Sequence, residues 1–210
     1  MFLYALTILV SAFLLFQVQP IIAKIILPWF GGTAAVWTVC LLFFQMVLLL
    51  GYLYAHALIR YLERRAQMLA HVGLLVISAL ALPVYPNASW KPLGPEDPTL
   101  RILGLLAATV GLPYFLLSTT GPLVQAWYAR RFKGAMPYRL YALSNLGSMF
   151  ALLSYPFLFE PAFATRQQAV MWSIGYGVFI VLCAGTAIAS EPFAGEAVAA
   201  EEAAAERPGP

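Results

Sequence analysis

The residues of this chain that could bind a polar ligand lie inside very hydrophobic segments. Gln17, Gln19 and Lys24 belong to an apolar run that begins at Phe2. Amide and ammonium groups are costly in hydrocarbon, so these side chains should face protein or water rather than lipid. Gln17 and Lys24 are seven residues apart and would share one helix face unless Pro20 bends the helix between them. Gln17 is therefore either a contact for a substrate, an ion or a headgroup, or a hydrogen-bonding partner of a neighbouring helix.

Four polar side chains form a stripe along one face of a later apolar segment. Tyr141, Ser144, Asn145 and Ser148 occupy positions i, i+3, i+4 and i+7 of a helix. Small polar residues allow two helices to pack closely and to hydrogen-bond to each other, which is the first interpretation. The second interpretation is a polar cavity shared with Gln17.

A Ser-Thr-Thr-Gly-Pro sequence interrupts another apolar segment at residues 118–122. Pro122 removes a backbone donor, and the hydroxyl groups before it can bond the carbonyls that it frees. The sequence favours a proline kink of this kind, and the alternative is a broken helix such as those that line transporter sites. Gln125 follows the interruption. The predicted substrate-binding set is Gln17, Gln125, Ser144, Asn145 and Ser148.

Nothing in the sequence indicates catalysis. No Gly-rich nucleotide loop, P-loop or H-E-x-x-H pattern is present. Cys40 and Cys183 lie in apolar segments without ligand-type neighbours, so they are predicted to be buried hydrophobic residues. His56 and His71 lie near the ends of two different segments and suggest no metal site. We expect no cofactor, no metal and no nucleic-acid partner.

The composition is that of an integral membrane protein. Of the 210 residues, 62% are hydrophobic and 10% are charged, whereas a soluble domain has about 25% charged residues. None of the apolar segments alternates with the period of two that barrel strands need, so we expect an all-α bundle. A span takes about 20 apolar residues, and six segments qualify: Leu3–Leu27, Ala34–Leu58, Met68–Val84, Ile102–Tyr128, Leu140–Phe159 and Ala169–Ala189.

The distribution of basic residues predicts the orientation. Seven of the twelve lie in the loops after the second and fourth segments, and four lie on the other side. The positive-inside rule then places both termini in the cytoplasm of a multi-pass protein, which we assign to a bacterial inner membrane. Glu160, at the end of the fifth segment, is predicted to be solvated, with proton coupling as the alternative. The residues that could contact lipid headgroups are Lys24, Arg64, Arg65, Arg130 and Arg131.

The composition changes after the sixth segment. Residues 191–210 are mainly Ala, Glu, Gly and Pro and hold five of the nine acidic residues. The sequence therefore predicts a six-helix transmembrane domain at residues 1–190, followed by a disordered acidic tail or linker at 191–210.

Two stretches together resemble a known family. PWFGGTAAVWTVCLLFFQMVLLLGYLYAH (Pro28–His56) and MPYRLYALSNLGSMFALLSYPFLFEP (Met136–Pro161) are similar to the membrane region of fused transporter-like/spermidine synthase-like proteins. The resemblance implies a bundle like one half of a major-facilitator protein, placed before a cytosolic aminopropyltransferase-like domain. No residues of that synthase domain are present in this sequence, so polyamine synthesis is not carried over to it.

The resemblance and the residues suggest three roles. The first is a non-catalytic membrane domain that anchors or serves a synthase-like domain. The second is a half-transporter that pairs with another six-helix unit to move a small solute. The third is a structural or headgroup-binding membrane protein. The spans have almost no acidic residues, which argues against direct translocation of a polyamine by this chain alone.

Overall fold

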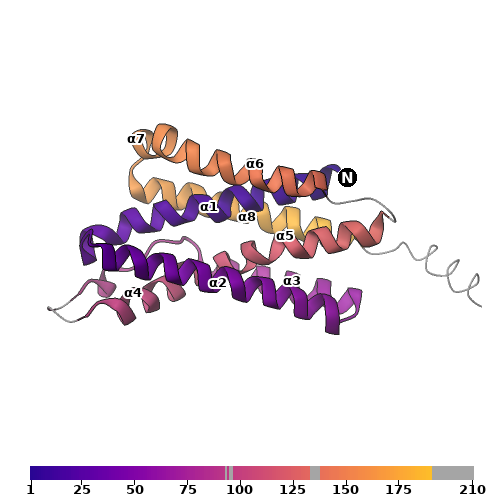
Figure 1. Ribbon diagram of the computed structural model, residues 1–210, viewed down its shortest axis with the longest axis horizontal. Coiled ribbons are helices and arrows are strands. Elements are labelled where there is room, and N and C mark those ends of the chain that lie inside the picture. The colour runs from indigo at the N-terminus through magenta and orange to yellow at the C-terminus, as the bar shows by residue number, and fades with distance from the viewer. Residues whose placement is uncertain (93, 95–96, 133–137, 191–210) are drawn as a thin grey trace, which may run out of the picture.

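The computed structural model describes residues 1–92, 94, 97–132 and 138–190. Within those ranges every regular element is helical, and the long helices run side by side along one axis (Figure 1). The α-helices are α1 (Phe2–Phe30), α2 (Ala34–Tyr61), α3 (Arg64–Ser78), α4 (Thr99–Leu106), α5 (Leu112–Arg131), α6 (Tyr138–Ser154), α7 (Glu160–Ala162) and α8 (Thr165–Ala189). Short 3-10 turns are η1 (Ala79–Ala81) and η2 (Ala88–Trp90), and π-helical turns are η3 (Ala107–Gly111) and η4 (Tyr155–Phe159).

Five helical stretches are long and apolar enough to cross a membrane, which confirms an all-α, multi-pass membrane protein. They are Phe2–Phe30, Ala34–Tyr61, Thr99–Arg131, Tyr138–Ala162 and Thr165–Ala189. The predicted segment Met68–Val84 forms a shorter element, because α3 has 15 residues and η1 extends it only to Ala81. Pro83 follows two residues later, and a proline disfavours helix in the residue before it. The tail predicted at 191–210 lies outside the described residues.

The connection between α1 and α2 shows how the sequence ends one helix and starts the next. Pro20 and Pro28 lie inside α1, which nevertheless continues to Phe30. Gly31 then has φ 86°, a left-handed conformation that glycine adopts without strain, and its N–H donates to the Leu27 carbonyl at 2.8 Å. Thr33 begins α2 by accepting the Val36 N–H on its side-chain oxygen at 3.5 Å.

Helix α1 is the central helix of the bundle. It packs against α6, α8 and α5, and more lightly against α2. Helix α2 packs on α5 and α4, while α3 packs on α8 and α5. The largest buried cluster joins α1, α2, α5 and α8 and includes Ile22, Phe44, Leu116 and Phe179.

The packing has an internal two-fold relation. The relation exchanges α1 with α5, α2 with α6, and α3 with α8. Under this exchange the α1–α6 contact corresponds to the α5–α2 contact, and the α1–α8 contact corresponds to the α5–α3 contact. The α1–α5 and α3–α8 contacts map onto themselves. The relation is partial, because the counterparts of the α1–α2 and α5–α8 contacts, namely α5–α6 and α1–α3, are weaker or absent in the described part of the chain. Helices α1 and α5 run in opposite directions (Figure 1).

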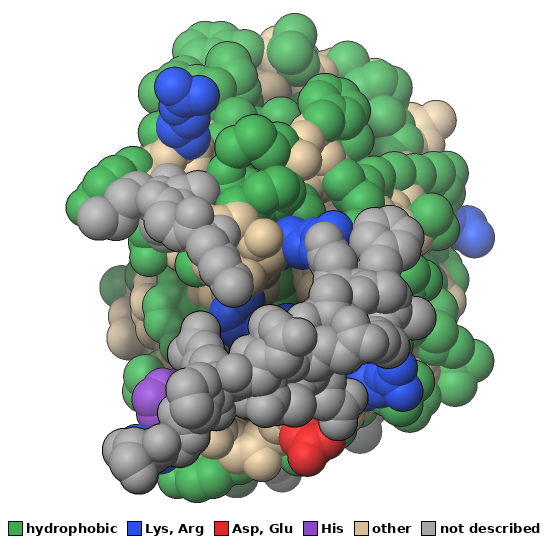
Figure 2. All heavy atoms as spheres, turned by 90° about the vertical axis from the view of Figure 1, so that its right-hand side faces the viewer, with side chains coloured by type: hydrophobic (Ala, Val, Ile, Leu, Met, Phe, Trp, Pro, Cys, Tyr) green, Lys and Arg blue, Asp and Glu red, His purple; other side chains and the backbone are tan. Residues whose placement is uncertain are grey.

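The two ends of the bundle differ in charge. Arg60, Arg64, Arg130 and Arg131 lie at helix ends close to the N-terminus, at the right of Figure 1, and we call this the basic end. Figure 2 looks onto it and shows Lys and Arg side chains spread among hydrophobic ones. The end of α1, the start of α4 and α7 lie at the opposite end.

Candidate functional site

A polar cavity of about 320 Å³ lies between α1, α2, α5 and α6. Its wall is formed by α1 and α2 on one side and by α5 and α6 on the other, the helices that the partial two-fold relation exchanges. No charged side chain lines it within the described part of the chain. Its lining is Ser11, Ala12, Leu15, Phe16 and Gln19 from α1; Gln45, Leu48 and Tyr52 from α2; Tyr114, Leu117, Ser118 and Gly121 from α5; and Ser144, Asn145 and Ser148 from α6.

The lining from α1 and α5 follows the same register relative to a proline. Gln19 precedes Pro20 as Gly121 precedes Pro122, and both lining residues face the cavity. The positions four, five and eight residues before each proline also line it: Phe16, Leu15 and Ala12 in α1, and Ser118, Leu117 and Tyr114 in α5. The two-fold relation seen in the helix contacts therefore extends to the individual residues of the cavity wall.

Hydrogen bonds hold several of the polar groups in place. Gln19 donates from Nε2 to the Tyr114 hydroxyl at 3.3 Å and so joins the two proline-containing helices. Ser118 and Ser148 donate to carbonyls of their own helices at 2.6 and 2.9 Å. Each of these hydroxyl oxygens keeps acceptor capacity, so the wall can accept hydrogen bonds from a solute.

The cavity is open on the side of α2 and α6. Of the most hydrophobic 18 residues, only 28% are buried in α2 and 17% in the stretch Tyr138–Ala162 that contains α6, against 56% in α1. Gln45 and Asn145 are exposed there, and no hydrogen-bond partner of either side chain is found in the part of the chain that the structure describes. An amide in the middle of a span is unfavourable against lipid. Water or a polar surface on this side would lower that cost.

The structure brings together part of the predicted substrate-binding set. Ser144, Asn145 and Ser148 face the polar cavity. Gln17 does not, because it lies on another face of α1 with 2% of its surface exposed. Gln125 is 8% exposed and follows Gly121 by one helical turn, outside the lining.

Several lining residues were not predicted, namely Ser11, Gln19, Gln45, Tyr52, Tyr114 and Ser118. Gln45 could have been predicted from the sequence, because it is an amide in the middle of a strongly apolar segment. The two tyrosines could not, since an aromatic residue in a membrane helix is most often a packing residue.

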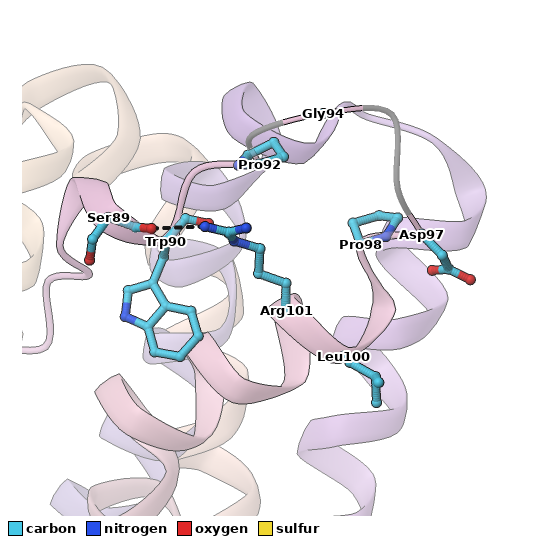
Figure 3. Close-up of a pocket in the computed structure, with 8 residues that line it drawn as sticks. All are labelled: Ser89, Trp90, Pro92, Gly94, Asp97, Pro98, Leu100 and Arg101. Atoms are coloured by element: carbon cyan, nitrogen blue, oxygen red, sulfur yellow. Dashed lines mark hydrogen bonds between the residues drawn. The ribbon is translucent and has the colours of Figure 1, made fainter.

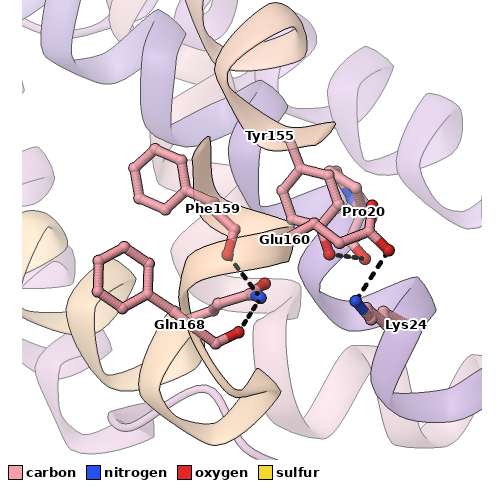
Figure 4. Close-up of polar contacts among 7 residues, drawn as sticks. Pro20, Lys24, Tyr155, Phe159, Glu160 and Gln168 are labelled. Atoms are coloured by element: carbon pink, nitrogen blue, oxygen red, sulfur yellow. Dashed lines mark hydrogen bonds and ion pairs between the residues drawn. The ribbon is translucent and has the colours of Figure 1, made fainter. Parts of the chain in front are cut away.

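Lys24 and Glu160 form an ion pair at the end opposite to the basic end (Figure 4). Lys24 Nζ lies 2.8 Å from Glu160 Oε1, with 38% and 45% of the two side chains exposed. Beside it, the Tyr155 hydroxyl donates to the Pro20 carbonyl at 3.4 Å. These contacts tie α1 to η4 and to the start of α7. Glu160 thus has a basic partner as well as solvent.

The other predicted headgroup residues gather at the basic end. Arg64 and Arg130 line one small pocket there, and Arg65 and Arg131 are their chain neighbours. Gln67, only 1% exposed, accepts from both Arg130 Nη2 at 2.9 Å and Trp127 Nε1 at 3.2 Å. The Arg130 guanidinium is thereby fixed against the ends of α3 and α5.

A larger cavity of about 550 Å³ lies in the connection before α4 (Figure 3). Its one guanidinium, that of Arg101, donates to the carbonyls of Trp90 and Ser89, both at 3.0 Å. Asp97 accepts from the Thr99 N–H at 2.9 Å, and bonds from the hydroxyl and backbone of Thr99 hold the pKa of this carboxyl below its ordinary value. These polar groups connect the loop to the start of α4, so we assign them a structural role.

Comparison of the chain with protein-family models, with curated proteins and with solved structures gave no match in any of the three. The resemblance to transporter-like/spermidine synthase-like proteins therefore stays a prediction that rests on the two stretches quoted above.

Proposed function

We propose that this chain is one half of a membrane unit that moves a small uncharged polar solute through the cavity between α1, α2, α5 and α6. A second six-helix unit, either another copy or another chain, closes the open side. The observation that carries the proposal is the exposure of Gln45 and Asn145 in mid-span, on the two least buried helices, at the mouth of a polar cavity.

The proposal includes six membrane crossings with both termini in the cytoplasm. Helix α3, with η1 and the extended residues after it, is the third crossing, because the chain leaves α2 at the basic end and starts α4 at the opposite end (Figure 1). The two-fold relation of the helix contacts supports two inverted units of three crossings, the arrangement of one major-facilitator half.

The cavity lining suggests the chemistry of the solute. Its hydroxyl and amide groups offer both donors and acceptors, and its tyrosines offer apolar ring faces. A neutral solute with several hydroxyl or amide groups fits this lining. A polyamine does not, because it would need carboxylates to replace its hydration.

An uptake measurement in proteoliposomes tests the proposal. A panel of radiolabelled neutral solutes and spermidine is compared between the unaltered chain, Asn145→Ala and Met149→Ala. Both residues are exposed on α6, but only Asn145 lines the cavity. We expect uptake of a neutral solute that Asn145→Ala lowers at least tenfold and Met149→Ala leaves unchanged. Equal effects of the two substitutions would exclude the half-transporter.

The resemblance favours a second role, a non-catalytic anchor for an aminopropyltransferase-like domain. Helix α8 ends at Ala189 on the side of the basic end, where a cytosolic domain would be attached (Figure 1). The test is to isolate the tagged chain from mild-detergent extracts of its own host and to assay aminopropyl transfer from decarboxylated S-adenosylmethionine to putrescine. Enrichment of this activity with the chain supports the anchor, and activity at the level of a mock isolation counts against it.

A further inference from the structure

A second cavity, of about 300 Å³, lies on another side of α1. It is lined by residues of α1 between Val10 and Ile21, by Phe159 of η4, and by residues of α8 between Gln168 and Val178. We call it the α1–α8 crevice. Apart from two glutamines, its lining side chains in the described part of the chain are hydrophobic. Met171 and Val178 at its edge are 40% and 53% exposed, so the crevice opens toward the lipid.

The two glutamines have buried amide atoms without partners. Gln17 is 2% exposed, and neither its nitrogen nor its oxygen has a hydrogen-bond partner among the described residues. Gln168 is 1% exposed; its Nε2 donates to the carbonyls of Phe163 at 2.7 Å and Phe159 at 3.2 Å, while its Oε1 is unpaired (Figure 4). Unpaired buried amides are destabilising and rare in native proteins, so they call for a partner.

Water alone is an incomplete occupant of the crevice. A water bonded to the amide atoms would leave the apolar remainder of the crevice unfilled. A molecule dissolved in the bilayer fits better, because it can fill the apolar volume and bring a polar group to the glutamines. A volume of about 300 Å³ is at the lower end of the range of small-molecule sites.

The unpaired atoms determine which kind of polar group that molecule can carry. Two of the three are carbonyl oxygens, Gln17 Oε1 and Gln168 Oε1, and they accept hydrogen bonds. An ester or ketone only accepts and would leave both oxygens unpaired, whereas a hydroxyl group donates to one of the two oxygens and accepts from Gln17 Nε2. No cation lines the crevice in the described part of the chain, so nothing there favours an acid anion or a phosphate.

We propose that the α1–α8 crevice binds an uncharged lipid alcohol, with its hydroxyl at Gln17 and Gln168 and its hydrocarbon chain along α1 and α8. This site is separate from the polar cavity and does not depend on solute transport. The contact pairs the Gln17 amide, which is unfavourable when the crevice is empty.

Fluorescence quenching provides the test, because Trp172 lies in the crevice wall. Its Nε1 donates to the Leu14 carbonyl at 2.9 Å, which fixes the ring beside the site. The protein is a variant of this 210-residue chain in which the other four tryptophans are phenylalanine, reconstituted in phosphatidylcholine nanodiscs. The probes are bromododecanol and bromododecane, which share a bromine and a chain length but differ in the hydroxyl group.

The quantity measured is the ratio of the half-quenching concentrations of bromododecane and bromododecanol. We expect Gln17→Met to lower this ratio about two- to tenfold, the range that one neutral hydrogen bond gives. Gln45→Met, a matched change in the polar cavity, should leave it unchanged. Val178→Phe, at the crevice edge, should weaken quenching by both probes.

Three results would overturn the proposal. An equal ratio in the unaltered protein and Gln17→Met means that the crevice takes any hydrocarbon chain. Absence of quenching by either probe means that it is closed. An effect of Gln45→Met as large as that of Gln17→Met means that the selectivity arises elsewhere. Met is close to Gln in shape and removes an unpaired group, so the melting temperature of Gln17→Met should not fall; Gln17→Leu provides a second variant.

Discussion

Gly147 of α6 lies directly against the backbone of Leu9 in α1. A Cβ atom added at Gly147 would be 2.7 Å from the Leu9 carbonyl oxygen and 3.3 Å from the Ala12 Cβ. Backbone cannot move aside as a flexible side chain can, so Gly147→Ala must push the two helices apart. We expect it to lower the free energy of unfolding by about 1–3 kcal/mol, the usual effect of overpacking, as measured by thermal or denaturant unfolding in detergent.

The control for this prediction is Gly177→Ala in α8. No atom lies within 4 Å of a Cβ added there, and alanine is the better helix former by about 1 kcal/mol. Gly177→Ala should therefore be neutral or stabilising. Similar effects of the two substitutions would contradict close α1–α6 packing at Gly147.

Gln67 supports the basic end through its side-chain oxygen. Because this one atom accepts from both Trp127 and Arg130, Gln67→Leu leaves an indole N–H and part of a guanidinium without their acceptor. We expect a loss of about 1–3 kcal/mol in the free energy of unfolding. Gln45→Leu, at an exposed position of α2, is the comparison and should lose far less. A neutral Gln67→Leu would mean that water replaces the amide oxygen.

The Lys24–Glu160 ion pair should contribute little to stability despite its short distance. Both side chains are more than a third exposed, and exposed pairs are worth about 0.2–1 kcal/mol. A double-mutant cycle with Lys24→Ala and Glu160→Ala measures the coupling. A coupling energy well above this range would show that lipid or a partner shields the pair from water.

The sequence predicted the helical class and most of the spans because hydrophobic runs of this length have few alternatives. It did not predict which glutamine faces the polar cavity. Gln17 and Gln19 are two residues apart and so point to very different sides of α1. Only the packing of α6 and α8 on α1 decides that Gln19 reaches Tyr114 while Gln17 enters the α1–α8 crevice.

Contacts between segments far apart in the chain also could not be predicted from the sequence. Lys24 and Glu160 are 136 residues apart, and neither residue alone indicates the other as its partner. The stripe on α6 illustrates the opposite case. Its helical spacing placed Ser144, Asn145 and Ser148 on one face, and that face does line a cavity. The spacing could not distinguish a cavity from close packing, and the structure shows both, since Gly147 makes the close contact beside the cavity.

If the polar cavity holds water and solute rather than lipid, cysteine labelling in intact membranes will detect it. Asn145→Cys and Phe150→Cys place thiols at two exposed positions of α6, of which only the first lines the cavity. The native Cys40 and Cys183 are buried and provide the background. Both variants are treated in intact membranes with a charged, membrane-impermeant thiol reagent. We predict that Asn145→Cys is labelled at least tenfold faster than Phe150→Cys. Equal, slow labelling of both would place lipid at the mouth of the cavity and contradict the proposed solute pathway.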